Sequence, residues 1–254
     1  MKRLILISND DGYHAKGINC LIDMLKDLGD IIVCAPESGR SGSSRAFSTV
    51  PLSLKHRKHF SYPNRDVSLG ENSIDVWSCS GTPVDCVKMA YAKLCPRKAD
   101  IVIGGINHGD NASTNSHYSG TVGVVMEGAL KKIPSIAFSL CDYDDDADFE
   151  PMRETVRELV AKTLNEGLPE YVCLNVNFPK EWNGETRRCR MAHGHWRNEV
   201  EERTHPTSGK KYYWMAGYYQ NDEPDAEDTD AWAIAHGIAS ITPLTADQTY
   251  TGEL

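Results

Sequence analysis

Two carboxylates stand side by side at Asp10 and Asp11, directly after the apolar run LILIS at residues 4–8. Adjacent negative charges repel, and the repulsion grows where a strand end is partly shielded from water. A hard divalent cation such as Mg²⁺ or Mn²⁺ prefers oxygen ligands, and its charge would balance the pair. Side chains alternate between the faces of a strand, so the two carboxylates converge only if the backbone turns, which Gly12 permits. Taken by itself, the tripeptide fits an ordinary turn with a helix-capping aspartate better than it fits a metal site.

Two further polar loops follow predicted strands, SGRSGSS at residues 38–44 and GINHGDNASTNSHYSGT at residues 105–121. In open α/β sheets, ligands bind beyond the carboxyl ends of the strands. Ser41 and Asn107, one in each loop, can supply the neutral oxygen ligands that complete a metal shell. Polar loops of small residues at three strand ends favour a ligand site over a simple turn.

The same loops offer places for an anion. Residues 41–44 carry hydroxyls and backbone amides without bulk, and YSGT at residues 118–121 stands where a helix is predicted to begin. A helix N-terminus attracts negative charge, so a phosphate would fit there. The alternative is that Ser119 is an ordinary helix cap and that the glycines serve close packing.

Signatures of other phosphate-binding classes are missing from the chain. No GxGxxG follows the first strand and no GxxxxGK[ST] occurs anywhere, so dinucleotide-binding and Walker-type sites are excluded. Phosphatases that form an aspartyl-phosphate usually space their carboxylates as DxD, whereas Asp10 and Asp11 are adjacent. Their adjacency argues against that class.

Histidines and tryptophans provide weaker signals. His14, His108 and His117 lie in the candidate loops, and loop histidines are more often structural than catalytic. His117 is the best candidate for a general acid because it precedes YSGT. The remaining aromatic candidates are more typical of cores or interfaces than of base-stacking platforms: Trp182, Trp196, Trp214 and Trp232.

The elements that must position these residues follow from hydrophobic periodicity. Strands are expected at residues 3–8, 31–35, 73–79, 100–105, 134–139 and 171–179, and helices at 16–28, from Thr82-Pro83 to Leu94, from Gly120 to about Leu130, and at 152–166. The strands are apolar without alternation, which suits a mostly parallel sheet covered on both faces. The fold class is therefore α/β with a doubly wound core. The acidic run DYDDDADFE at 142–150 is expected to be a solvated loop.

A segment near the C-terminus has a different composition. Residues 196–226 are rich in charge, Tyr and Trp but lack continuous apolar sequence. They predict an extended β-hairpin arm that cannot bury itself alone. With neither internal repeats nor a low-complexity linker, residues 1–254 are expected to form one domain with this projecting arm.

Composition limits the possible partners. Lys plus Arg is 27 and Asp plus Glu is 36, giving a net charge of −9, which disfavours binding to duplex nucleic acid or an anionic membrane. Strand-like sequence begins at Leu4, so no signal peptide is expected, and no apolar run reaches membrane-spanning length. The eight cysteines include no CxxC pair, which favours reduced thiols in the cytoplasm over a zinc site.

The order of motifs resembles one known family, the survival-protein-E (SurE) nucleotidases. The chain carries SNDDG, HAxGI, RSGSS, SGTPVDCVKMA, GINHGDN, YSGTVGVVMEG, IPSIAFS, LNVNFP and TDAWAIAHGIASITPL in the order seen in that family. The resemblance extends over about residues 3 to 245, and several motifs are long, so it is specific.

This resemblance implies a Rossmann-like fold and a divalent-metal-dependent phosphatase acting on nucleoside 5′- and 3′-monophosphates. It also implies one Mg²⁺ or Mn²⁺ per subunit and an arm exchanged between subunits, giving a homodimer or homotetramer. Carried over by motif, the metal ligands are Asp10, Asp11, Ser41 and Asn107, of which Asp10 and Asp11 are the catalytic residues. The positions that match the phosphate side are Asn111, Ser119, Gly120 and Thr121.

The chain departs from the family at three places, none of which touches the predicted metal ligands. It has Glu37-Ser38 after the second strand, Lys16 before Gly17, and a loop at 111–118 without the frequent acidic residues. The alternative functions are a broad phosphomonoesterase or exopolyphosphatase, and a nucleotide sensor without catalysis. The predicted metal ligands are all present, which argues against the sensor.

Overall fold

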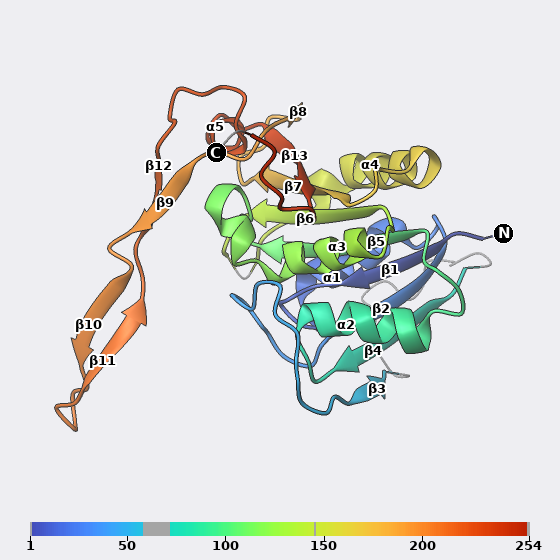
Figure 1. Cartoon of the computed structure of the whole chain (residues 1–254), viewed down its shortest axis with the longest axis horizontal. Coiled ribbons are helices and arrows are strands. Elements are labelled where there is room, and N and C mark those ends of the chain that lie inside the picture. The colour runs from blue at the N-terminus through green and yellow to red at the C-terminus, as the bar shows by residue number, and fades with distance from the viewer. Residues whose placement is uncertain (1, 58–71, 145, 253–254) are drawn as a thin grey trace.

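A computed structural model describes residues 2–57, 72–144 and 146–252 of the chain (Figure 1). Its central sheet has, within these residues, the strand order β3-β4-β2-β1-β5-β6-β7-β13-β8. The strands are β1 (Leu4–Ser8), β2 (Asp30–Pro36), β3 (Leu54–His56), β4 (Ile74–Cys79), β5 (Ile101–His108), β6 (Ser135–Cys141), β7 (Val172–Pro179), β8 (Thr186–Arg188) and β13 (Ala239–Thr245). Neighbours from β4 to β7 pair in parallel, whereas β3 and β13 run antiparallel to β4 and β7. The predicted mostly parallel α/β sheet is confirmed.

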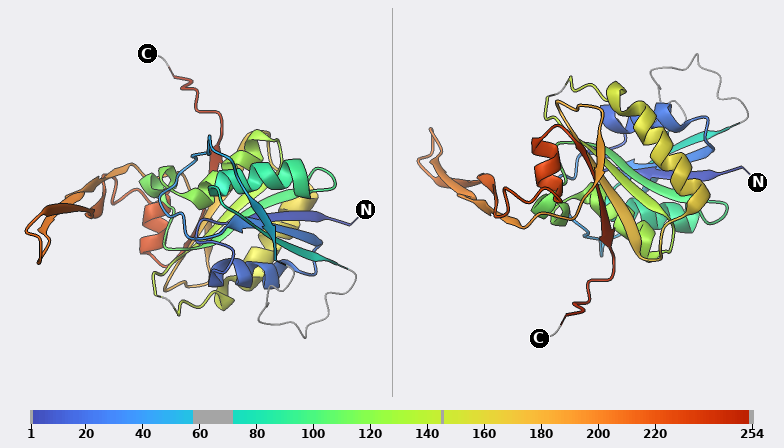
Figure 2. Two further views of the ribbon diagram at one scale, coloured as in Figure 1. Left: turned by 90° about the horizontal axis from the view of Figure 1, so that it is seen from below. Right: turned by 90° about the horizontal axis from the view of Figure 1, so that it is seen from above.

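Helices cover both faces of the sheet (Figure 2). They are α1 (Lys16–Leu25), α2 (Pro83–Met89), α3 (Gly120–Leu130), α4 (Arg153–Glu166) and α5 (Asp230–Ala235), with short helical turns η1 (Ala90–Leu94), η2 (Ser113–His117) and η3 (Glu150–Met152). Alternate side chains of β1 enter different cores: Ile5 and Ile7 pack with α1 and α4, and Leu4 and Leu6 pack with α2 and α3. Burial on both faces explains why the strand sequences show no alternation.

Two helix boundaries show what local signals can and cannot predict. The predicted start of α2 is confirmed, because Thr82 accepts a hydrogen bond from the backbone of Asp85 and the Asp85 carboxylate accepts one from the backbone of Thr82. The predicted helix 16–28 is shorter than expected and ends at Leu25. The backbone N–H of Leu28 still bonds the carbonyl of Leu25, so the apolar period continues through a turn after the helix has ended.

Strand β5 is longer than predicted and carries polar residues to the edge of the sheet. The expected strand 100–105 extends to His108, with a register shift against β6 between Gly104 and Asn107. Asn107 and His108 still pair with Ser139 and Leu140 of β6. The hydrophobic pattern did not predict this extension, because Asn107 and His108 are polar, whereas sheet pairing depends on backbone hydrogen bonds.

The expected arm projects from the body of the molecule (Figure 1). It consists of two successive antiparallel ladders, β9 (Gly194–Arg197) with β12 (Tyr218–Asn221), and β10 (Val200–Thr204) with β11 (Lys211–Met215). Its strands run from residue 194 to 221, slightly before the predicted range 196–226 at both ends. Every residue of β10 and β11 is exposed, so this end of the arm buries nothing within its own chain.

In the acidic run 142–150, Lys180 pairs with the carboxylates of Asp142 and Asp144 at 3.1 and 2.5 Å, and Asp145 lies outside the described residues. Over the part of the chain that the structure describes, none of the helices is both long and apolar enough to cross a membrane.

Candidate active site

Loops at the carboxyl ends of β1, β2 and β5 meet beside the start of α3 and line an open cavity of about 230 Å³. Its lining combines predicted site residues with residues that no sequence signal singled out. The lining residues are Asp10, Ser41, Gly42, Asn107, His108, Asn111, Asn115, Tyr118, Ser119 and Trp196. The topology thus brings together residues far apart in the chain, as expected at the strand ends of an open α/β sheet.

Asp10 is held by the first residues of α3. Its Oδ2 accepts a 3.1 Å hydrogen bond from the backbone N–H of Gly120, and its Oδ1 accepts a 2.6 Å bond from the hydroxyl of Thr121. The side chain is only 4% exposed, and this burial raises its pKa although the hydrogen bonds oppose the shift. The carboxylate therefore has a defined position at a helix N-terminus.

The carboxylate of Asp11 has fewer hydrogen-bond donors to offset its negative charge than that of Asp10 has. Its Oδ2 is buried and has no hydrogen-bond partner. Burial, followed by the negative charge of Asp10, raises the pKa of Asp11 to about 6, and a hydrogen bond from the His108 backbone opposes the shift only in part. The backbone turns here as predicted: Gly12 has φ +98°, and the side chain of Asn9 bonds both backbone groups of Gly12. An orphaned, buried carboxylate oxygen beside a second carboxylate fits a site for a cation.

Neutral oxygen donors line the cavity together with Asp10, whereas Asp11 adjoins Asp10 but is absent from the lining. The side-chain nitrogen of Asn107 donates to the carbonyls of His108 at 3.0 Å and Gly109 at 2.8 Å, so its Oδ1 remains available as a ligand. Ser41 lines the same cavity from the loop after β2. Two carboxylates with an amide oxygen and a hydroxyl make an all-oxygen donor set, which fits a hard divalent cation such as Mg²⁺ or Mn²⁺. Among the described residues, no cluster of three or more His, Cys, Asp or Glu side chains could hold a metal ion.

The four residues assigned to the phosphate side play different parts. Asn111 and Ser119 line the cavity. The Asn111 side chain donates to Ser139 at 2.8 Å, and the Ser119 hydroxyl accepts from the backbone of Val122 at 3.0 Å, so Ser119 caps α3 as the structural alternative foresaw. Gly120 and Thr121 direct their donors at Asp10 and are absent from the lining.

Gly120 has a steric reason to be glycine. A Cβ at this position would lie 2.7 Å from the Cβ of Asp10 and 2.9 Å from Pro83 Cγ and Ser43 Oγ. The start of α3, the start of α2 and the first two loops therefore approach each other more closely than any other residue would allow.

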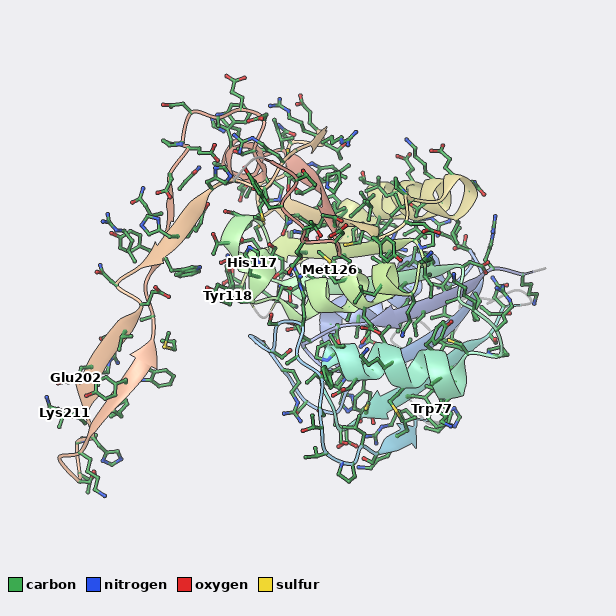
Figure 3. All side chains as sticks on the ribbon, viewed as in Figure 1. Trp77, His117, Tyr118, Met126, Glu202 and Lys211 are labelled. Atoms are coloured by element: carbon green, nitrogen blue, oxygen red, sulfur yellow. The ribbon has the colours of Figure 1, made fainter. Side chains whose placement is uncertain are left out.

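Among the candidate histidines, the lining includes His108 but not His117 or His14. His117 is exposed, and its contribution is a backbone carbonyl that accepts a 2.5 Å hydrogen bond from Ser44. Figure 3 shows His117 and Tyr118 beside each other at the side of the body that faces the arm. The preference for His117 as general acid therefore finds no support in the geometry, because order along the chain did not reveal which side chains turn into the cavity.

Sequence reasoning missed Asn115, Tyr118 and Trp196 as cavity residues. Trp196, which was expected to be a core or interface residue, reaches the cavity from β9 at the base of the arm. Tyr118 comes from the turn between η2 and α3. A tryptophan within an aromatic-rich hairpin carries no local signal that it belongs to a site formed by residues far earlier in the chain.

Comparisons with known proteins agree with the observed fold. Residues 5–198 match the family model described as Survival protein SurE. The 5′-nucleotidase SurE of Phocaeicola vulgatus is 48% identical over 99% of this chain and 94% of its own length, and that of Bacteroides thetaiotaomicron is 47% identical over 99% and 93%. The crystal structure of the Sure protein from Aquifex aeolicus has a TM-score of 0.77 and 35% identity, covering 97% of this chain and 94% of that chain.

Proposed function

The chain belongs to the survival protein SurE family, and from this premise we propose that it is a metal-dependent 5′-nucleotidase. It hydrolyses nucleoside 5′-monophosphates, and also 3′-monophosphates, to nucleoside and phosphate. The observation that carries the proposal is the adjacent pair of buried Asp10 and half-buried Asp11, with the orphaned Oδ2 of Asp11, at a cavity that Asp10 lines together with Asn107 and Ser41. Relatives that bear the name 5′-nucleotidase SurE are similar over nearly their whole length.

Asp10, Asp11, Ser41 and Asn107 would hold one divalent cation, Mg²⁺ or Mn²⁺, in each subunit. The bound cation supplies positive charge that offsets the two carboxylates and the phosphoryl oxygens. In this arrangement an acidic protein with a net charge of −9 can still bind an anionic substrate.

Asp10 is the residue placed to orient the attacking water and to accept its proton. Hydrogen bonds from Gly120 and Thr121 fix both of its oxygens, so the carboxylate does not have to reorganise during the reaction. Water adds to phosphorus and the bond from phosphorus to the nucleoside oxygen breaks, which releases inorganic phosphate and the nucleoside hydroxyl. Asp11 is the second catalytic residue in this proposal, and its carboxylate would complete the cation site.

Asn111 and Ser119 face the cavity and would contact the phosphate, with the N-terminus of α3 adding its favourable dipole. Gly120 and Thr121 support the phosphate side indirectly through Asp10. A direct phosphate contact from either of them would require its hydrogen bond to Asp10 to be exchanged.

The test is phosphate release from a panel of nucleoside 5′- and 3′-monophosphates, with Mg²⁺, Mn²⁺ or EDTA. The proposal expects turnover with a divalent cation and none in EDTA. A protein that binds nucleotides without turnover would be a sensor. Faster turnover of simple phosphomonoesters or short polyphosphate than of any nucleotide would make it a broad phosphatase or exopolyphosphatase.

The proposal includes one domain with the arm as its oligomerisation element, giving a homodimer or homotetramer. Exposed aromatic residues on β11 support this role, since clustered apolar side chains at a surface mark interfaces: Tyr212, Tyr213 and Trp214. A cytoplasmic location is supported by the eight cysteines, all of which are unpaired.

A further inference from the structure

The lining of the cavity at the candidate active site includes residues beyond those proposed to hold a cation and a phosphate. Its lining combines the polar and charged side chains of Asp10, Ser41 and Asn107 with the aromatic side chains of Tyr118 and Trp196. A nucleoside monophosphate has the same combination, since a charged phosphate is joined through the sugar to a flat base. A substrate without a base would leave the aromatic side chains unused.

The indole of Trp196 is fixed in place by a chain of hydrogen bonds. Its Nε1 donates to Oδ1 of Asn115 at 2.9 Å, and Nδ2 of Asn115 donates to Oδ1 of Asp110 at 2.9 Å. The polar edge of the ring is therefore already satisfied, which leaves its apolar surface as the part that can contact a ligand. A ring held in this way loses little conformational entropy on binding.

The strand that carries Trp196 is also anchored to the site. Gly194 accepts a 2.7 Å hydrogen bond at its carbonyl from the hydroxyl of Thr114, and Tyr219 of the paired strand contacts the hydroxyl of Ser113. Ser113 in turn donates its backbone N–H to the buried carboxylate of Asp230 at 2.8 Å. The base of the arm, β9 with β12, is thus bound to the turn η2 and presents Trp196 to the cavity without requiring any movement.

We propose that Trp196 is the specificity-determining residue that stacks on the base of the nucleotide, with Tyr118 at the edge of the same subsite. The assignment rests on the proposed nucleotidase function and deepens it. Aromatic stacking accepts every base, because each base has a π-face, so it selects nucleotides as a class. The enzyme should therefore prefer nucleoside monophosphates over sugar phosphates and discriminate only weakly between bases.

The test compares AMP with ribose 5-phosphate, which has the same phosphoester and sugar but no base. The variants are Trp196→Phe, which keeps an aromatic ring, and Trp196→Leu, which keeps apolar bulk alone. For Trp196→Leu we expect KM for AMP to rise about 10-fold or more, with kcat changed less than about twofold. Its kcat/KM for ribose 5-phosphate should stay within about twofold of the parent, and Trp196→Phe should retain most of the affinity for AMP.

Trp214→Leu is the matched control, because Trp214 lies on the same arm in β11, is 57% exposed, and is outside the cavity lining. It should leave the ratio of kcat/KM values for AMP and ribose 5-phosphate unchanged. Calorimetric titration of AMP in EDTA, where no turnover is expected, provides a second readout and should show weaker binding only in Trp196→Leu.

The outcomes separate the two proposals. If the parent protein hydrolyses neither compound with Mg²⁺ or Mn²⁺, the proposed function fails. If the parent hydrolyses AMP but the KM of Trp196→Leu for AMP is no higher than that of Trp196→Phe, the base-stacking role is overturned while the nucleotidase function stands. An equal loss for AMP and ribose 5-phosphate in Trp196→Leu would also overturn it, because the residue would then be structural.

Discussion

The hydroxyl of Thr121 donates a 2.6 Å hydrogen bond to Oδ1 of Asp10, and both side chains are buried. This contact joins the first turn of α3 to the end of β1 and fixes the carboxylate that we propose as the proton acceptor. Thr121 acts on the reaction through Asp10, so it is a positioning residue rather than a catalytic one.

Thr121→Val should lower kcat/KM for AMP by roughly 10- to 100-fold, because a buried hydrogen bond to a charged group is lost while the shape is kept. Thr121→Ser retains the hydroxyl and is the matched control, with activity near that of the parent. Steady-state kinetics measure the change in kcat/KM, and calorimetric titration measures the affinity for Mn²⁺. A Thr121→Val protein that is fully active at limiting Mn²⁺ would remove Thr121 from the site.

Asp11→Asn should reduce both metal affinity and turnover by more than about 100-fold, because it removes half of the negative charge that balances the cation. Ser41→Ala should cost much less, since water can replace a neutral ligand but not a carboxylate. Near-normal phosphatase rates for Asp11→Asn at limiting metal would contradict the site assignment. Equal losses in both variants, with unchanged metal binding in Ser41→Ala, would instead identify Ser41 as a nucleophile.

Asp11→Asn should also stabilise the metal-free protein, to an extent that depends on pH. The folded-state pKa of Asp11 is about 6 against an ordinary value of 3.8, so the folded protein holds this proton more tightly than the unfolded chain does. The penalty of ionised Asp11 is absent below about pH 4, where both states are protonated, and it grows as the pH rises to about 6. In EDTA at pH 7, Asp11→Asn should therefore raise the free energy of unfolding, by at most about 3 kcal/mol.

Urea denaturation in EDTA at pH 4 and pH 7 measures this effect. The control is Asp27→Asn, because the pKa of Asp27 is lowered by its hydrogen bond with Arg157. Asp27→Asn should have the opposite effect on the free energy of unfolding. The stability that ionised Asp27 contributes is present above its unfolded-state pKa and is lost as the pH falls through the lowered folded-state pKa. Asp27→Asn should therefore lower the free energy of unfolding at pH 7. If Asp11→Asn is destabilising at pH 7 without metal, the buried carboxylates do not repel as described.

Removing the outer ladder of the arm should abolish the expected dimer. Residues 199–216 contain β10 and β11, which can be replaced by a short Gly/Ser bridge while β9, β12 and Trp196 remain. The ion pair of Glu202 and Lys211 on this ladder (Figure 3) is largely exposed and contributes little stability, so the aromatic residues are the expected interface. Light scattering at micromolar concentration should show a monomer or an aggregating species for the deletion. A parent protein that is monomeric, or a deletion that stays dimeric and stable, would refute the interface.

Sequence patterns alone predicted the layered α/β fold and suggested where a cation would bind. Apolar strands without alternation predicted a covered parallel sheet, Thr82 and Pro83 marked the start of α2, and NDDG with its neighbouring loops pointed to Asp10 and Asp11. These signals are local: periodicity, capping and turn chemistry depend on neighbouring residues and are legible in a single stretch of chain. Sequence motifs also led to Ser41 and Asn107, because each lies in a polar loop that comes after a predicted strand.

How these parts meet follows from the folded structure alone. The hydrogen bond from Thr121 to Asp10 spans 111 positions in the chain, and the bond from Trp196 to Asn115 spans 81. In the structure, His108 rather than His117 lines the cavity, and β5 continues through polar residues. Trp196, which was expected in a core or interface, also lines the cavity. Such contacts depend on the packing of distant elements, and the side chain that fills a given cavity is set by the three-dimensional path of the backbone rather than by any pattern along it.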